Sequence, residues 1–206
     1  MELRDYQVEG LEAIRAALLR GVWSQVLVWP CGAGKTIAFA HLPIVLRDWL
    51  AQWPRGRMLI LAHREELLDQ AAAKLRAVNP SLMVGIEQGA RCSGPFDDVV
   101  IASLQTLTAN RAARLKRLDP EEFRIVVYDE AHHVPSQTGQ TVLGHFGLIP
   151  PTALRPPARA TDPVMYAARE ACAAWWREQP AERLLLGVTA TPARADGLGL
   201  EWSFQT

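Results

Sequence analysis

Continuous apolar runs recur along the chain, and they predict strands buried on both faces. Each run holds four or five apolar residues, without the alternation expected of a strand with one solvent-exposed face. Buried strands of this kind are typical of parallel sheets covered by helices. The runs are residues 26–29, 58–62, 99–102, 125–128 and 184–188.

Between these runs the apolar residues follow helical spacing. Val8, Leu11, Ile14 and Leu18 recur every three or four positions, which predicts an amphipathic helix from residue 5 to about residue 19. Residues 65–78 and 105–118 predict further helices. Alternating strands and helices favour a three-layer α/β fold, in which helices cover both faces of a parallel sheet.

A proline-rich segment at about residues 149–182 interrupts this alternation. It contains six of the 14 prolines, and we interpret it as an insertion into the sheet domain. Within it, Thr161 and Asp162 resemble a helix cap followed by Pro163 at a first turn, which predicts a surface helix. The adjacent Trp175 and Trp176 either pack on their own domain or form a docking surface.

Length and composition favour one domain. With 206 residues and 49% hydrophobic residues, the chain can bury one substantial core. The formal net charge is zero, so any binding to nucleic acid depends on local groups. The three cysteines form no paired motif, the N-terminus lacks the features of an export signal, and no apolar run reaches the length of a membrane span. We therefore expect a cytoplasmic protein without a membrane segment.

The segment after the first predicted strand has the pattern of a phosphate-binding loop. Small residues allow backbone N–H groups to approach phosphates, and the following helix N-terminus favours negative charge. We assign Lys35 to the β- and γ-phosphates of ATP and Thr36 to Mg²⁺. A simple turn followed by an exposed lysine is the alternative. The expected ATP-binding residues of the loop are Pro30, Cys31, Gly32, Ala33, Gly34, Lys35 and Thr36.

Two carboxylates follow the apolar run at residues 125–128. Asp129 is suited to hold Mg²⁺ through a water molecule, and Glu130 to orient the attacking water. With Lys35, these residues form the predicted catalytic set. The alternative is that both acids cap the start of a helix. His132 and His133 lack further ligands at metal-site spacing, so we expect hydrogen-bonding roles, functional for His132 and structural for His133.

In this order the motifs resemble superfamily 2 helicases, in particular the UvrB, type III restriction and RadD-like group. The loop departs from the common phosphate-loop pattern, because Trp29 stands where that pattern has glycine, but it is similar to the form typical of superfamily 2. The resemblance extends over most of the chain. It implies a RecA-like motor domain that binds ATP and Mg²⁺, and DNA rather than RNA as the nucleic acid.

The resemblance also implies roles for further residues. Residues 3–7 resemble the motif that reads adenine, which assigns Gln7, with Arg4, to the base of ATP. Thr189 and Thr191 resemble the motif that, with His132, couples ATP state to nucleic acid. The implied contacts to nucleic acid are His63, Arg64, Ser103, Gln105 and Thr106.

Several of these residues have an ordinary structural alternative, which for Arg64 is a solvated position on a helix. Gln7 is also suited to the start of a helix, and Ser103 and Thr106 to capping one. For the Thr-Ala-Thr-Pro segment that begins at Thr189, the alternative is a simple strand exit. The basic residues between 111 and 117 favour an exposed helix face over a phosphate contact, so they are not assigned to the site.

Superfamily 2 motors bind ATP between two RecA-like domains, and the second supplies arginine fingers. We expect this second domain to be absent from the 206 residues, and to be supplied by a longer chain or in trans. An arginine finger contributes about 10³ to 10⁵ in rate in related systems, so we expect slow turnover by this chain alone. A P-loop kinase or transport ATPase, and a catalytically silent binding module, are the competing interpretations.

Overall fold

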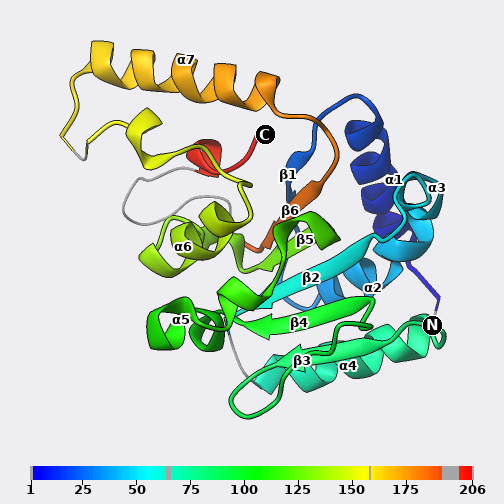
Figure 1. Ribbon diagram of the computed structural model, residues 1–206. Coiled ribbons are helices and arrows are strands. Elements are labelled where there is room, and N and C mark those ends of the chain that lie inside the picture. The colour runs from blue at the N-terminus through cyan, green and yellow to red at the C-terminus, as the bar shows by residue number, and fades with distance from the viewer. Residues whose placement is uncertain (1, 64–65, 158, 192–199, 206) are drawn as a thin grey trace.

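The strands form one fully parallel sheet. The computed structural model describes residues 2–63, 66–157, 159–191 and 200–205 (Figure 1). The strand order across the sheet is β1-β6-β5-β2-β4-β3, and each neighbouring pair is parallel. The strands are β1 (Ser24–Val28), β2 (Arg57–Ala62), β3 (Val84–Glu87), β4 (Val99–Ser103), β5 (Phe123–Asp129) and β6 (Leu184–Thr189).

The connections between the strands place helices on both faces of the sheet. Right-handed crossovers put α2 and α4 on one face, because the chain moves from β1 through β2 to β3 in one direction. The chain then returns through β5 to β6, which puts α5 and α6 on the other face (Figure 1). The helices are α1 (Asp5–Leu19), α2 (Lys35–Val45), α3 (Arg47–Leu50), α4 (Glu66–Val78), α5 (Leu104–Ala112), α6 (Gln137–His145) and α7 (Asp162–Glu178).

The expected three-layer α/β architecture is confirmed. Every residue of β2, β4 and β6 is buried, as the continuous apolar runs predict. The helix predicted from residue 5 to about 19 is α1, whose apolar stripe of Leu11, Ile14 and Leu18 faces the core. Short 3₁₀ turns complete the described chain: η1 (Leu115–Arg117), η2 (Pro120–Glu122), η3 (Ala131–His133), η4 (Thr152–Leu154) and η5 (Leu200–Trp202).

The prediction of one helix over residues 105–118 is wrong for the second half of that range. Regular α-helical geometry in α5 stops before Ala109, and Asn110, Arg111 and Ala112 all have positive φ. The turn that follows directs Arg114 back to the buried Glu87, with 2.8 Å between Nη1 and Oε2. Arg114 also donates to the carbonyl oxygens of two residues in the loop after β3. Arg114 is therefore held in an ion pair with a residue distant in sequence, and it does not belong to the exposed basic helix face predicted between residues 111 and 117.

The surface helix expected in the proline-rich segment is confirmed as α7. Thr161 is its N-cap residue and Pro163 lies in its first turn. Figure 1 shows α7 apart from the sheet, beside the C-terminal segment. Trp175 and Trp176 both pack against Trp23, with ring centroids 6.1 and 4.9 Å away. The tryptophan pair thus packs on its own domain.

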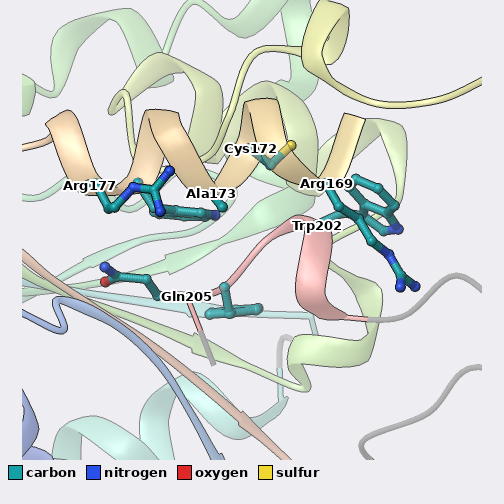
Figure 2. A pocket seen from close by; sticks show the side chains of 8 residues that line it. Arg169, Cys172, Ala173, Arg177, Trp202 and Gln205 are labelled. Carbon is teal, nitrogen blue, oxygen red and sulfur yellow. The ribbon is translucent and has the colours of Figure 1, made fainter. Parts of the chain in front are cut away.

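A cavity of about 570 Å³ lies between α7 and the C-terminal segment. Figure 2 shows Cys172 and Ala173 on the helix side and Trp202 and Gln205 opposite them. The guanidinium group of Arg169 lies 5.9 Å from the ring centroid of Trp202. None of the residues predicted to bind ATP or nucleic acid lines this cavity.

Candidate active site

Three neighbouring strand ends bring the predicted motifs together. The phosphate loop follows β1, Asp129 ends β5, and Thr189 ends β6, which lies between them. Thr189 is in register with Val28, and its carbonyl oxygen accepts a 3.0 Å hydrogen bond from the backbone N–H of Trp29. Parallel α/β sheets bind their ligands at the carboxyl ends of strands. The sheet order thus assembles one site from segments about 60 to 160 positions apart.

The phosphate loop has the backbone shape that its glycines predict. Gly32 and Gly34 have φ of 80° and 76°, values that L side chains rarely adopt. Gly34 is the N-cap residue of α2, so the helix begins at Lys35. The first N–H groups of a helix have no intrahelical acceptor, and the helix dipole favours an anion beside them. The loop therefore presents backbone donors and an ammonium group together.

Gln7 holds this loop from the start of α1. Gln7 is 3% exposed. Its Nε2 donates to the carbonyl oxygen of Ala33 at 2.9 Å, and its Oε1 accepts from the backbone N–H of Arg4 at 2.9 Å. The Tyr6 hydroxyl donates to the same Ala33 oxygen, also at 2.9 Å. The predicted adenine-reading residues thus adjoin the loop, and Gln7 braces it directly.

Trp29, the residue at which the loop departs from the common pattern, packs against the start of α1. Its ring lies edge-on to Tyr6, with 5.5 Å between ring centroids. A Cβ atom at Gly10 would lie 2.6 Å from Cζ2 of Trp29, so α1 approaches the indole where only glycine fits. A glycine in place of Trp29 would leave this contact to α1 unfilled. In the sequence, Gly10 is marked only as a glycine within a helical pattern, and Tyr6 only as a member of the motif at residues 3–7.

The two acidic residues differ in environment and backbone. Burial raises the pKa of Asp129 above its ordinary value, Glu130 raises it further, and the nearby Lys35 ammonium group opposes both. Glu130 has φ of 57°, which is unusual for a residue other than glycine, and its backbone N–H donates to Oδ1 of Asp129 at 3.1 Å. Strained backbone of this kind is concentrated at functional sites.

The predicted coupling residues are in contact. Nδ1 of His132 lies 3.1 Å from Oγ1 of Thr189 and 3.3 Å from Oε2 of Glu130. The Thr189 hydroxyl also donates to the carbonyl oxygen of Thr191 at 3.0 Å and accepts from its N–H at 3.1 Å. His132 therefore connects the end of β6 with the acid at the end of β5.

The predicted nucleic-acid residues do not form one exposed set. Ser103 is fully buried, and its hydroxyl caps α5 by accepting from the N–H of Thr106 at 3.4 Å. Gln105 is exposed and Thr106 is half-buried. The ring of His63 packs against His133. Arg64 lies outside the described residues, as do residues 192–199 after the Thr-Ala-Thr segment.

The donor set fits a nucleotide with Mg²⁺. Gly32 has open space where a Cβ would stand, so the loop leaves room beside its N–H groups. The hydroxyl of Thr36 and the carboxylate of Asp129 are oxygen ligands of the kind that Mg²⁺ prefers. A divalent cation near Asp129 would favour its ionised form against the effect of burial.

The parallel sheet, the loop after β1 and the acidic pair after β5 define a RecA-like P-loop domain of the superfamily 2 kind. Residues 1–194 match the family described as the type III restriction enzyme, res subunit. The chain therefore belongs to this family.

Two curated relatives are helicases by name. The chain is 35% identical over 147 residues to the putative ATP-dependent helicase IRC3 of Saccharomyces cerevisiae, covering 70% of this chain and 21% of that protein. It is 29% identical over 201 residues to the putative mitochondrial ATP-dependent helicase irc3 of Schizosaccharomyces pombe, covering 97% and 28%. The chain thus spans less than a third of either relative's length. One relative is named as mitochondrial, so a cytoplasmic location stays a prediction.

A solved structure shares the fold. The Sulfolobus solfataricus SWI2/SNF2 ATPase core in complex with double-stranded DNA superposes with a TM-score of 0.63 at 16% identity. The match covers 99% of this chain and 36% of that one. Within the part of the chain that the structure describes, no helix has the length and apolar character needed to cross a membrane.

Proposed function

We propose that this chain is the ATP-binding motor domain of an ATP-dependent DNA helicase or translocase. The observation that carries the proposal is the convergence of Lys35, Asp129 and Thr189 at three neighbouring strand ends. Membership of the res-subunit family and the helicase names of the relatives support it.

In this proposal the protein groups divide the work of phosphoryl transfer. The N–H groups of the loop and the Lys35 ammonium group bind and orient the phosphates. Thr36 and Asp129 would hold Mg²⁺, which supplies charge stabilisation to the phosphate oxygens when bound. Glu130 lies beside Asp129 and orients the attacking water through its carboxylate.

His132 gives this arrangement a link to the nucleic-acid side. Its contacts with Glu130 and Thr189 join the water-orienting acid to the strand that ends in the coupling motif. A shift of β6 on nucleic-acid binding would therefore alter the position of Glu130. We propose that exposed Gln105, with Thr106 and Arg64, contacts one strand of DNA.

We further propose that a second RecA-like domain, in the same longer protein or in trans, completes the ATP site. Without its arginine groups, turnover should fall by about 10³ or more. The purified 206-residue chain should therefore bind ATP with Mg²⁺ but hydrolyse it slowly.

Hydrolysis by the chain joined to its second domain tests the proposal. Single-stranded DNA should stimulate hydrolysis more than RNA of the same sequence, and Glu130→Gln should bind ATP normally while losing turnover. Hydrolysis that no nucleic acid stimulates would favour a kinase or transport ATPase. Binding without hydrolysis in the completed protein would favour a silent module.

A further inference from the structure

Three imidazole rings form a continuous stack beside the candidate active site. The ring of His133 lies between those of His63 and His132, with centroid distances of 4.4 and 4.1 Å. The planes of the contacting rings are tilted by 57° and 43° to one another. His63 follows β2, whereas the other two histidines belong to η3 after β5. The stack therefore bridges two neighbouring strand ends.

One end of the stack reaches the water-orienting acid. Nδ1 of His132 contacts both the Glu130 carboxylate and the Thr189 hydroxyl. A carboxylate only accepts hydrogen bonds, so the contact is favourable when Nδ1 carries the hydrogen. The Thr189 hydroxyl can then accept from His132 and donate to the carbonyl of Thr191. The tilt of the His132 ring thus sets where its N–H points relative to Glu130.

The other end of the stack lies where nucleic acid is proposed to bind. His63 directly precedes Arg64. Its Nε2 is buried and has no hydrogen-bond partner among the described residues. Burial lowers the pKa of His63, the neighbouring His132 lowers it further, and Glu130 opposes both effects. A neutral imidazole that packs on another ring is better suited to pass on a change of position than to bind a phosphate.

These histidines do not form a metal site. Within the described ranges, no group of three histidine, cysteine or acidic residues is arranged to hold a metal ion. Packed rings cannot interpenetrate, so a displacement of His63 toward His133 would press on the His133 ring and, through it, on His132. A packed stack can therefore convey small movements between strand ends.

We propose that His63 and His133 are positioning residues that link the β2 strand end to Glu130 through His132. The inference rests on the proposed function, because it assumes that nucleotide occupies the loop and that nucleic acid contacts the β2 end. His63 thereby gains a role beyond the predicted nucleic-acid contact. His133 acts through its shape, so another flat ring should replace it.

Histidine-selective NMR of the 206-residue chain tests this link without requiring hydrolysis. Adding a non-hydrolysable ATP analogue with Mg²⁺ should shift the ring resonances of His63, although that residue lies outside the ATP-binding set. In His133→Ala the shift should fall at least about threefold, while the nucleotide Kd stays within about twofold. His133→Phe keeps a flat ring and should restore the response. His145, whose Nε2 contacts the Leu118 carbonyl, serves as the unresponsive internal reference.

The outcomes separate the two proposals. A His63 response in His133→Ala equal to that of the native chain would overturn the proposed link through His133. The same conclusion would follow if the native chain bound nucleotide and its His63 resonances did not shift. Loss of the response in both variants would also overturn it, because a flat ring would then not suffice. If the native chain binds no nucleotide at all, the proposed function fails instead. Circular dichroism of each variant confirms that the fold is retained.

Discussion

The side-chain amide of Gln7 donates a 2.9 Å hydrogen bond to the carbonyl oxygen of Ala33, in the middle of the phosphate loop. Its Oε1 accepts from the N–H of Arg4. An amide has two N–H groups and two lone pairs, so one of each remains after these contacts. Gln7 can thus brace the loop and still offer a donor and an acceptor to adenine.

Replacing Gln7 separates these two roles. If Gln7 reads adenine, Gln7→Ala should weaken ATP binding by about tenfold and GTP binding much less. If it only braces the loop, both nucleotides should weaken by the same factor. Isothermal titration of the two nucleotides measures the ratio, and Gln52→Ala, at an exposed position, is the matched control.

Lys35 is expected to contribute most of the phosphate affinity. Lys35→Ala removes the ammonium group at the start of α2 and should weaken ATP binding by at least about 100-fold, since charge-assisted contacts to phosphate are strong. Lys116→Ala removes an exposed lysine in η1 and should leave the Kd unchanged. Similar affinities in the two variants would mean that the nucleotide binds elsewhere.

Asp129 should reduce stability in the absence of a cation. Its pKa is raised in the folded chain, so the folded state binds more protons, and stability falls as pH rises from the ordinary aspartate pKa through the raised one. Asp129→Asn should therefore be more stable at neutral pH, by on the order of 1 kcal/mol. The advantage should shrink as pH is lowered toward the ordinary pKa.

Urea unfolding as a function of pH measures this difference. Asp48→Asn, at an exposed position, should change stability little at any pH. A native chain as stable as Asp129→Asn at neutral pH would contradict the raised pKa. Asp129→Asn should also weaken the binding of ATP with Mg²⁺. The substitution would then raise the stability of the fold and lower its affinity for nucleotide.

Gly10 should not tolerate a side chain. Alanine improves helix propensity by about 1 kcal/mol, but at Gly10 its Cβ would lie 2.6 Å from the Trp29 ring. Overpacking costs about 1–3 kcal/mol, so Gly10→Ala should destabilise the fold and weaken ATP binding by displacing α1. In Gly144→Ala the new Cβ meets no atom within 4 Å, and the substitution should stabilise α6. Thermal unfolding of both variants measures these effects. A change in melting temperature of the same sign in both would rule out the contact with Trp29 as the cause of a destabilised Gly10→Ala variant.

The sequence predicts the sheet and the strand-end motifs well, because both depend on local patterns. Continuous apolar runs identify buried strands, and the loop before Lys35 and the acids after residues 125–128 follow two of them directly. The site then assembles because β6 lies between β1 and β5. Parallel α/β topology makes strand ends meet at one edge, so local motifs suffice to predict a shared site.

Features that depend on distant contacts could not be predicted in this way. The edge strand β3 is short and contains Gly85, so no apolar run marks it. The break in α5 accompanies an ion pair between Arg114 and Glu87, which lie 27 positions apart. The contact of His63 with His133 likewise joins residues 70 positions apart, and neither residue forms a motif with the other.

A structure of the chain with ATP and Mg²⁺ tests the central claim most directly. The account predicts triphosphate density against the loop of Gly32 and Gly34, with Lys35 on the terminal phosphates and Mg²⁺ between Thr36 and Asp129. Nucleotide bound at another place, or Asp129 and Glu130 directed away from the phosphates, would contradict it.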